Sequence, residues 1–261
     1  MGDSDKCRVI TVANARGGCG KTFLSTHLAY MLAERRQRVL LIDTDPQGTV
    51  GVWLGLDHAE TLFNFLLGES GIDDVIVPYK GKFDVILSKE SIKEAELRMV
   101  GMMGREYTLR NKLTEYNVLD RYDFIIIDTS PSLSLLNQNA FLASDEVLIP
   151  VNMEPLAVVG ASSIIETIKI VRKMFKHKIA LLGVVPTFVT RASNVAKAVL
   201  DLINKNYDSV LPQIRQSVKI KEASGTFQTV NELDPKTPVV DDLVVLVDRV
   251  MQGRIETEVK K

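Results

Sequence analysis

A glycine-rich segment near the amino end has residue types and spacing suited to holding phosphate groups. It reads Ala15-Arg16-Gly17-Gly18-Cys19-Gly20-Lys21-Thr22, directly after the apolar run 9–13 and directly before a helical pattern. Glycines let backbone N–H groups close around phosphates, and the new helix adds unpaired N–H donors and the positive end of its dipole. Lys21 can reach the β- and γ-phosphates of a nucleotide, and the Thr22 hydroxyl can bind Mg²⁺. We therefore interpret the segment as a P-loop, although Ala15 stands where the strict pattern has glycine.

Carboxylates follow two later apolar runs, where a P-loop protein needs them for its metal. The run 124–127 ends in Asp128, and the run 39–42 ends in Asp43-Thr44-Asp45-Pro46. In open α/β sheets ligands bind at the carboxyl ends of the strands, so these side chains are expected at the phosphate site. A single strand-end Asp can equally be a turn former. Two such ends after one P-loop favour a nucleotide site.

The elements that must position these residues alternate along the chain. Short apolar runs are expected as strands and longer periodic stretches as helices. The expected strands are 9–13, 39–42, 83–87, 124–127, 147–151 and 180–185, and the expected helices are 22–35, 92–116, 160–175 and 194–206. Continuous apolar strands alternating with helices predict an α/β fold with a doubly wound, mostly parallel sheet covered by helices on both faces. No repeat or linker interrupts the pattern, so we expect one domain over 1–261, with a tail that frays at about 253–261.

Composition adds only coarse limits. The formal net charge is −1, and the two cysteines, Cys7 and Cys19, form no metal-ligand or CxxC pattern. No apolar stretch is long enough for a membrane span, and the amino end lacks a signal-peptide core, so a cytoplasmic location is expected. The apolar periodicity of 239–251 predicts a helix packed on the sheet. The alternative, a membrane-surface helix, would want a cationic polar face, whereas this one carries Asp241, Asp242 and Asp248.

These motifs resemble the ParA/MinD group of deviant Walker A ATPases, and within it the short ParA (Soj-like) partition ATPases. The segment 16–22 is similar to the group's Lys-Gly-Gly-x-Gly-Lys-Thr, and 43–48 matches its Asp-x-Asp-Pro-Gln-Gly. The segment 128–133 is similar to its Asp-Thr-Pro-Pro-Ser, while 147–155 and 214–223 resemble later group segments. The likeness runs from about residue 8 to 250.

The resemblance implies a role for each matching residue. Lys21 and the amides of Gly17, Gly18, Cys19 and Gly20 would hold the phosphates of ATP, with Thr22, Asp43 and Asp128 acting on Mg²⁺ or its waters. Asp45 would orient the attacking water. The adenine pocket would lie near Pro186, Thr187, Ile214 and Arg215. The group's signature lysine, which reaches the partner's nucleotide in a sandwich dimer, is replaced by Arg16, whose planar fork is not equivalent to a lysine. Cys19 among the phosphate amides is expected to be a small filler, the alternative being a redox-sensitive thiol.

A basic stretch suggests the cargo surface. Residues 169–221 hold eleven basic and two acidic residues, a net charge of +9. The alternative is a set of solvated helix faces, but a face for the phosphate backbone is the more economical interpretation. The resemblance places DNA contacts at Arg215, Lys219 and Lys221, and implies non-specific binding by an ATP-bound homodimer on the nucleoid, with a ParB-like or other adaptor protein stimulating weak hydrolysis. Two alternatives stay open: a MinD-like membrane-associated division-site regulator and a P-loop metabolic enzyme.

Overall fold

Seven short strands form one sheet in the computed structural model, which describes residues 7–132, 134–190 and 193–253. Leu133, Arg191 of the basic stretch and the tail 254–261 lie outside this part. The strands run in the order β3-β4-β2-β5-β1-β6-β7, and all neighbours pair in parallel except β3 and β4. Their bounds are β1 Arg8–Val12, β2 Val39–Asp43, β3 Ile76–Tyr79, β4 Phe83–Ile86, β5 Phe124–Asp128, β6 Glu146–Asn152 and β7 Ala180–Thr187. The predicted doubly wound, mostly parallel sheet is confirmed.

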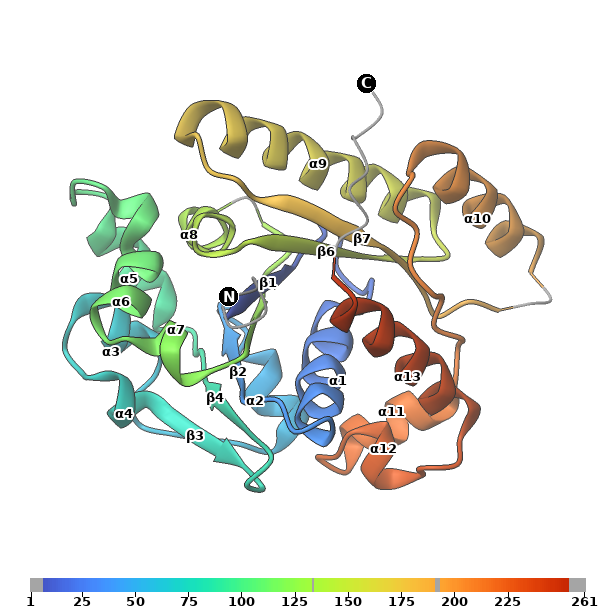
Figure 1. Ribbon diagram of the computed structural model, residues 1–261, viewed down its shortest axis with the longest axis horizontal. Helices are drawn as coiled ribbons and strands as arrows, with labels where there is room; N and C mark the ends of the chain where they lie inside the picture. Colours follow the sequence, from blue (N-terminus) through green and yellow to red (C-terminus); the bar gives the residue numbers. More distant parts are fainter. Residues whose placement is uncertain (1–6, 133, 191–192, 254–261) are drawn as a thin grey trace.

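Helices cover both faces of this sheet (Figure 1). Leu41 and Ile126 belong to the core on the face of α1 and α13, whereas their neighbours Leu40 and Ile125 belong to the core under α3, α5 and α6. Side chains alternate along a strand, so a strand buried on both faces must be apolar throughout. The helices are α1 Lys21–Glu34, α2 Thr49–Leu54, α3 Leu62–Leu67, α4 Ile72–Val75, α5 Ile92–Met99, α6 Thr108–Glu115, α7 Val118–Arg121, α8 Leu135–Ala143, α9 Pro155–Phe175, α10 Asn194–Asn206, α11 Val218–Gly225, α12 Val230–Leu233 and α13 Pro238–Met251, with a 3₁₀ turn, η2, at Arg105–Tyr107.

Two expected helices differ from the structure, and one strand was not expected. The helix expected over 92–116 is divided into α5, η2 and α6, because Gly101 and Gly104 interrupt it and Gly104 adopts a left-handed φ of 68°. Helix α9 begins at Pro155 rather than at 160, since proline is favoured in the first turn of a helix. Strand β3 was not predicted. It is four residues long, contains Pro78 and lies at the sheet edge, where a strand gives little signal.

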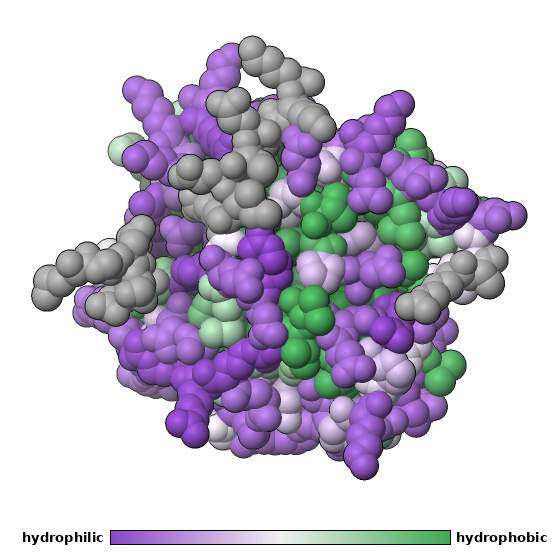
Figure 2. All heavy atoms as spheres, turned by 45° about the vertical axis from the view of Figure 1, so that its right-hand side comes forward, coloured by the Kyte–Doolittle hydropathy of each residue, from purple (hydrophilic) through white to green (hydrophobic). Residues whose placement is uncertain are grey.

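The amphipathic helix expected over 239–251 is present as α13, but its apolar face packs on α1 rather than directly on the sheet. Its buried residues are Val239, Val240, Leu243, Leu246, Val247 and Val250. Figure 2 shows the face that carries α10 and α13, where hydrophobic residues lie among hydrophilic ones; the exposed apolar side chains of these two helices are Val195, Leu202, Val244, Val245 and Met251. Within the described residues, no helix has the length and apolarity needed to cross a membrane.

Candidate nucleotide site

The carboxyl ends of β1, β5 and β2 bring the predicted phosphate loop and the predicted carboxylates together. Strand β5 lies between the other two, and Asp128 is paired in register with both Val12 and Asp43. Helix α1 starts at the same edge, so its first turn meets Asp128. The Thr22 hydroxyl donates to Asp128 Oδ2 at 2.7 Å, and the Ser25 hydroxyl donates to Asp128 Oδ1 at 2.8 Å. The P-loop helix is thus tied to the strand that carries the acid.

Asp43 and Asp128 are two buried carboxylates whose setting fits a cation. Asp43 accepts backbone N–H bonds from Asp45 at 2.9 Å and from Val50 at 3.1 Å. Burial raises the pKa of both carboxyls, and the charge of Asp128 raises the pKa of Asp43 further. A divalent cation nearby would offset the cost of keeping both groups ionised. Two hydroxyls also lie at this point, because Thr22 Oγ1 and Thr49 Oγ1 are 3.0 Å apart.

These carboxylates do not form a complete metal cage. Over the described part of the chain, no group of three or more His, Cys, Asp or Glu side chains could hold a metal ion. Magnesium commonly takes few protein ligands and completes its shell with waters and substrate phosphates. The donor set here, hydroxyls and carboxylates beside a phosphate loop, fits that mode of binding.

A hollow of about 580 Å³ opens over the loop. It is lined by Gly17, Gly18, Gly20, Lys21, Thr22, Phe23, Asp45, Gln47, Thr49, Trp53, Pro131, Phe188, Ile220, Lys221 and Ser224. One carboxylate oxygen of Asp45 accepts a hydrogen bond from the Gln47 backbone N–H at 2.9 Å. The orientation of Asp45 is therefore fixed by its own turn, at the wall of the hollow that also carries Lys21.

The loop is closed by contacts within itself. Lys21 is buried, and its ammonium donates to the carbonyl oxygens of Asn14 at 3.2 Å and Arg16 at 3.0 Å. The Cys19 thiol donates to the same Arg16 carbonyl at 3.2 Å, and burial raises its pKa. A buried thiol with a raised pKa is a poor nucleophile, which supports the filler interpretation of Cys19.

Helix α9 packs directly against the loop, a contact that the sequence patterns did not reveal. The Asn14 amide donates to Pro150 O at 2.7 Å and Ala157 O at 3.2 Å, and its Oδ1 accepts from the Arg16 backbone N–H at 2.9 Å. A Cβ at Gly160 would collide with Asn14 Oδ1 and lie 3.1 Å from the Arg16 nitrogen. The missing side chain of Gly160 therefore permits the approach of α9 to the loop.

Arg16 itself points away from these contacts. It is exposed, and across the described residues its guanidinium has neither a hydrogen bond nor an ion pair. A cation on a rigid loop, without a partner in its own chain, can reach a group on another molecule.

Comparisons with known proteins identify the family of this chain. A family described as an AAA domain matches residues 7–181. The sporulation initiation inhibitor protein Soj of Bacillus subtilis is 33% identical over 88% of this chain and 92% of its own length. The chain belongs to the ParA/MinD family of ATPases. The chromosome partitioning protein ParA of Caulobacter vibrioides is 33% identical, with 83% of each chain covered. Among solved structures, cobyrinic acid a,c-diamide synthase of Mycobacterium smegmatis superposes with a TM-score of 0.81 at 27% identity, covering 94% of both chains.

The residues predicted for the adenine lie beside the loop but do not line its hollow. Thr187 donates its hydroxyl to Cys19 O at 2.7 Å, and the Ile214 N–H bonds Pro186 O at 2.8 Å. Arg215 forms a two-pronged ion pair with Asp242 of α13, each bond 2.7 Å long. In this family member the end of β7 thus braces the P-loop, and Arg215 fastens α13.

The residues predicted to contact DNA differ in whether they have a carboxylate partner in the structure. Lys219 pairs with Glu222 at 2.8 Å, so that both Arg215 and Lys219 have carboxylate partners within the chain. Lys221 is exposed and lies at the rim of the nucleotide hollow.

Sequence reasoning missed the aromatic wall of the hollow. The rings of Phe23 and Phe188 are 5.7 Å apart, and those of Phe23 and Trp53 are 6.1 Å apart. Phe188 has a left-handed φ of 56°, which a bulky residue seldom adopts and which no sequence pattern announces.

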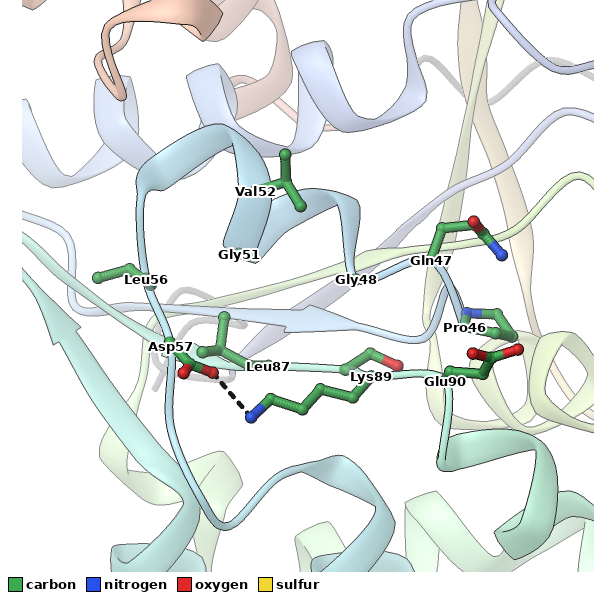
Figure 3. Close-up of a pocket in the computed structure, with 11 residues that line it drawn as sticks. Pro46, Gln47, Gly48, Gly51, Val52, Leu56, Asp57, Leu87, Lys89 and Glu90 are labelled. Atoms are coloured by element: carbon green, nitrogen blue, oxygen red, sulfur yellow. Dashed lines mark ion pairs between the residues drawn. The ribbon is translucent and has the colours of Figure 1, made fainter.

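A second hollow of about 360 Å³ lies behind the Pro46–Gly48 turn (Figure 3). Lys89 and Asp57 form an ion pair of 2.7 Å at its edge, and Val52, Leu56 and Leu87 supply apolar wall. Gln47 lines both hollows, so this turn lies between them, next to Asp45.

Proposed function

We propose that this chain is a partition-type ATPase that positions DNA or another cargo in the cytoplasm, associated with the nucleoid. The observation that carries the proposal is the meeting of Lys21, Thr22, Asp43, Asp45 and Asp128 at one edge of the sheet, with Arg16 free beside them. The names of the relatives support it, since one is a sporulation initiation inhibitor and another a chromosome partitioning protein.

ATP with Mg²⁺ would supply the phosphoryl group and the cation that neutralises its charge. The amides of Gly17, Gly18, Cys19 and Gly20 would hold the phosphates, with Lys21 exchanging its carbonyl partners for phosphate oxygens. Thr22, Asp43 and Asp128 would bind the metal or its waters. Asp45, oriented by the Gln47 N–H, would orient the attacking water. Phosphoryl transfer requires little more than this positioning and charge neutralisation.

The same proposal includes a dimer and a cargo. Two ATP-bound subunits would face each other across the loops, with Arg16 of each contacting the nucleotide of the other. The dimer would bind DNA non-specifically through Lys221, with Arg215 and Lys219 contributing once they exchange their carboxylate partners. An adaptor protein would stimulate hydrolysis and release.

The two alternatives differ in what they bind. A P-loop metabolic enzyme is favoured by one observation, the similarity to cobyrinic acid a,c-diamide synthase, two structures of which hold Mg²⁺ with ADP or with an ATP analogue. A MinD-like regulator would need a membrane-binding segment, and the acidic outer face of α13 is unsuited to that role.

Co-sedimentation with random-sequence duplex DNA, with and without ATP, separates these functions. We expect ATP-dependent binding that weakens steeply with salt, because neutralised phosphates release counterions. Lys219→Glu with Lys221→Glu is expected to abolish this binding and leave ATP-dependent dimerisation intact. A parent protein that hydrolyses ATP but never binds DNA would refute the DNA-cargo part of the proposal.

A further inference from the structure

A cluster of cations lies at the carboxyl end of α9, away from the nucleotide hollow. Its members are Arg110, Arg172, Lys173, Lys176 and Lys178, and all five are exposed. Four of them lie within seven consecutive residues, and Arg110 of α6 joins them through His177, whose Nδ1 is 3.2 Å from the Arg110 guanidinium. We call this surface the α9-end cluster.

The cluster is not neutralised by the part of the chain that the structure describes. Among the described residues, no carboxylate forms an ion pair with any of its five members. By contrast, Lys169, one turn earlier on α9, pairs with Glu166 at 2.8 Å. Arg172, Lys176 and Lys178 line a surface hollow of about 420 Å³ together with His177, Ile179 and Ala180, and none of these residues is acidic.

Part of the cluster serves the fold, and the remainder does not. The Arg172 guanidinium donates to Ile179 O at 2.6 Å and so closes the turn from α9 to β7. His177 donates from Nε2 to Ser144 O at 2.7 Å, so its Nδ1 is left to accept from Arg110. Cations near a helix carboxyl end also offset its dipole. The ammonium groups of Lys173, Lys176 and Lys178 have no hydrogen-bond partner in the described structure.

The position of the cluster sets it apart from the nucleotide. Helix α9 connects the end of β6 to the start of β7, its parallel neighbour. The carboxyl end of α9 therefore lies where the strands begin, whereas the P-loop lies where the strands end. Figure 1 shows this end of α9 on the side of α5 and α6, while α10 follows β7 at the far side. No residue that lines the nucleotide hollow belongs to the α9-end cluster or lines the hollow beside that cluster.

We propose that the α9-end cluster is a second contact surface for the phosphate backbone of duplex DNA. This inference rests on the proposed DNA-binding function and adds a surface to it. Duplex DNA carries one negative charge per about 1.7 Å of its axis, and several exposed lysines close together can neutralise several of these phosphates at once. A membrane surface fits less well, because Arg172 lies on the opposite side of α9 from the exposed Ile170 and Met174, and of the cluster residues on α9 only Lys173 adjoins them.

The test compares two triple variants with the same charge change. The first is Lys173→Gln, Lys176→Gln and Lys178→Gln. The control is Lys80→Gln, Lys82→Gln and Lys89→Gln, three exposed lysines that already pair with Glu232, Glu34 and Asp57. Fluorescence anisotropy of a labelled random duplex is measured over a salt series without nucleotide, and again with a non-hydrolysable ATP analogue.

For the cluster variant we expect at least tenfold weaker binding at low salt, and a slope of log K against log salt reduced by about 1 for each lysine removed. This loss should appear with the ATP analogue, where the parent binds DNA, while the control stays within about twofold of the parent. A cluster variant that keeps the parental slope overturns the inference and leaves the proposed function standing. An equal loss in the control also overturns it, because net charge would then be the cause.

Two further measurements separate the remaining outcomes. Nucleotide affinity and ATP-dependent dimerisation of the cluster variant should equal those of the parent, since both depend on residues at the carboxyl ends of the strands. If the parent neither binds ATP nor dimerises, and the cluster variant still binds DNA more weakly than the parent, the proposed function fails and the inference stands. Vesicles of phosphatidylcholine with anionic lipid should not bind the parent; cluster-dependent vesicle binding in place of DNA binding would overturn the inference.

Discussion

The ring of His27 accepts a hydrogen bond at Nε2 from the backbone N–H of Val230, 3.0 Å away, and so joins the P-loop helix to α12. Its Nδ1 donates to Phe23 O at 2.7 Å, which fixes the neutral tautomer. His27 is fully buried, and burial lowers its pKa from 6.5 to about 4. Helix α1 therefore supports both the phosphate loop and, through one ring, the carboxyl-terminal segment.

This arrangement predicts a loss of stability in mild acid. Because the folded pKa is below the unfolded one, the stabilisation is complete above pH 6.5 and is lost as the pH falls towards about 4. A shift of this size corresponds to about 3 kcal/mol. Urea unfolding from pH about 7.5 to about 4.5 measures it, with His27→Gln as the control that keeps an acceptor without titrating there. Parallel stability curves for parent and variant would show that His27 is not the source.

Lys21→Ala is predicted to lose nucleotide binding. The ammonium is the cation aimed at the phosphates, and a charge-assisted bond is worth about 1.5–3 kcal/mol, which is roughly ten- to hundredfold in affinity. Isothermal titration with ATP and Mg²⁺ measures the loss, and circular dichroism checks that the variant folds. Unchanged affinity would mean that Lys21 stays with its two carbonyls when nucleotide binds.

Asp45→Ala is predicted to bind ATP and to hydrolyse it at least tenfold more slowly, because its carboxylate orients water and does not hold the phosphates. Dimer should therefore accumulate. Asp57→Ala is a matched control, since Asp57 is exposed, pairs with Lys89 and lies behind the Pro46–Gly48 turn. The released phosphate is measured under single-turnover conditions. Hydrolysis by Asp45→Ala at the parental rate would remove it from the reaction.

Gly160→Ala is predicted to weaken nucleotide binding about tenfold, because overpacking in a filled site costs about 1–3 kcal/mol. The added methyl would collide with Asn14 Oδ1, which holds the Arg16 N–H, and the loop would have to shift. Gly101→Ala is the control, since a Cβ there meets nothing within 4 Å. A nucleotide affinity of Gly160→Ala equal to that of the parent would show that α9 moves to accommodate the methyl group and that the loop does not.

The site was readable from the sequence where a local pattern carried it, and not where distant segments meet. Residues 16–22, Asp43 and Asp128 follow strand ends, and strand ends of a parallel sheet share one edge. The bond from Asn14 to Ala157 and the approach of Gly160 join residues more than a hundred positions apart, and no periodicity encodes them. Edge strand β3 was missed for a related reason, because half-exposed positions and Pro78 weaken the apolar signal.

The pairing of the basic residues is visible only in the structure. The net charge of 169–221 was counted correctly, but counting cannot show which cations have partners. Arg215 and Lys219 were expected on the DNA surface, and both face carboxylates that follow them in the sequence by 27 and 3 positions. Three lysines without an ion pair in the described structure, Lys173, Lys176 and Lys178, lie close together where the chain turns into β7.

Arg16 carries the last prediction, because it replaces the lysine that this family uses across its dimer. Its side chain is exposed and without a partner in the described part of the chain, while its backbone is fixed by Asn14, Lys21 and Cys19. A free guanidinium on a fixed backbone could reach a phosphate of a facing subunit in the proposed dimer, and its fork can bind two oxygens.

Arg16→Ala is therefore predicted to weaken ATP-dependent dimerisation about a hundredfold or more, since a symmetric dimer would lose two contacts of about 1.5–3 kcal/mol each. Nucleotide binding by the monomer should be largely spared, because Lys21 and the loop amides are unchanged. Arg16→Lys restores the family residue and should dimerise as the parent does. Light scattering over a concentration series with a non-hydrolysable ATP analogue measures all three proteins. Indistinguishable dimer fractions for parent and Arg16→Ala would mean that another cation spans the interface, and a dimer formed only by Arg16→Lys would mean that the guanidinium is too bulky for its slot.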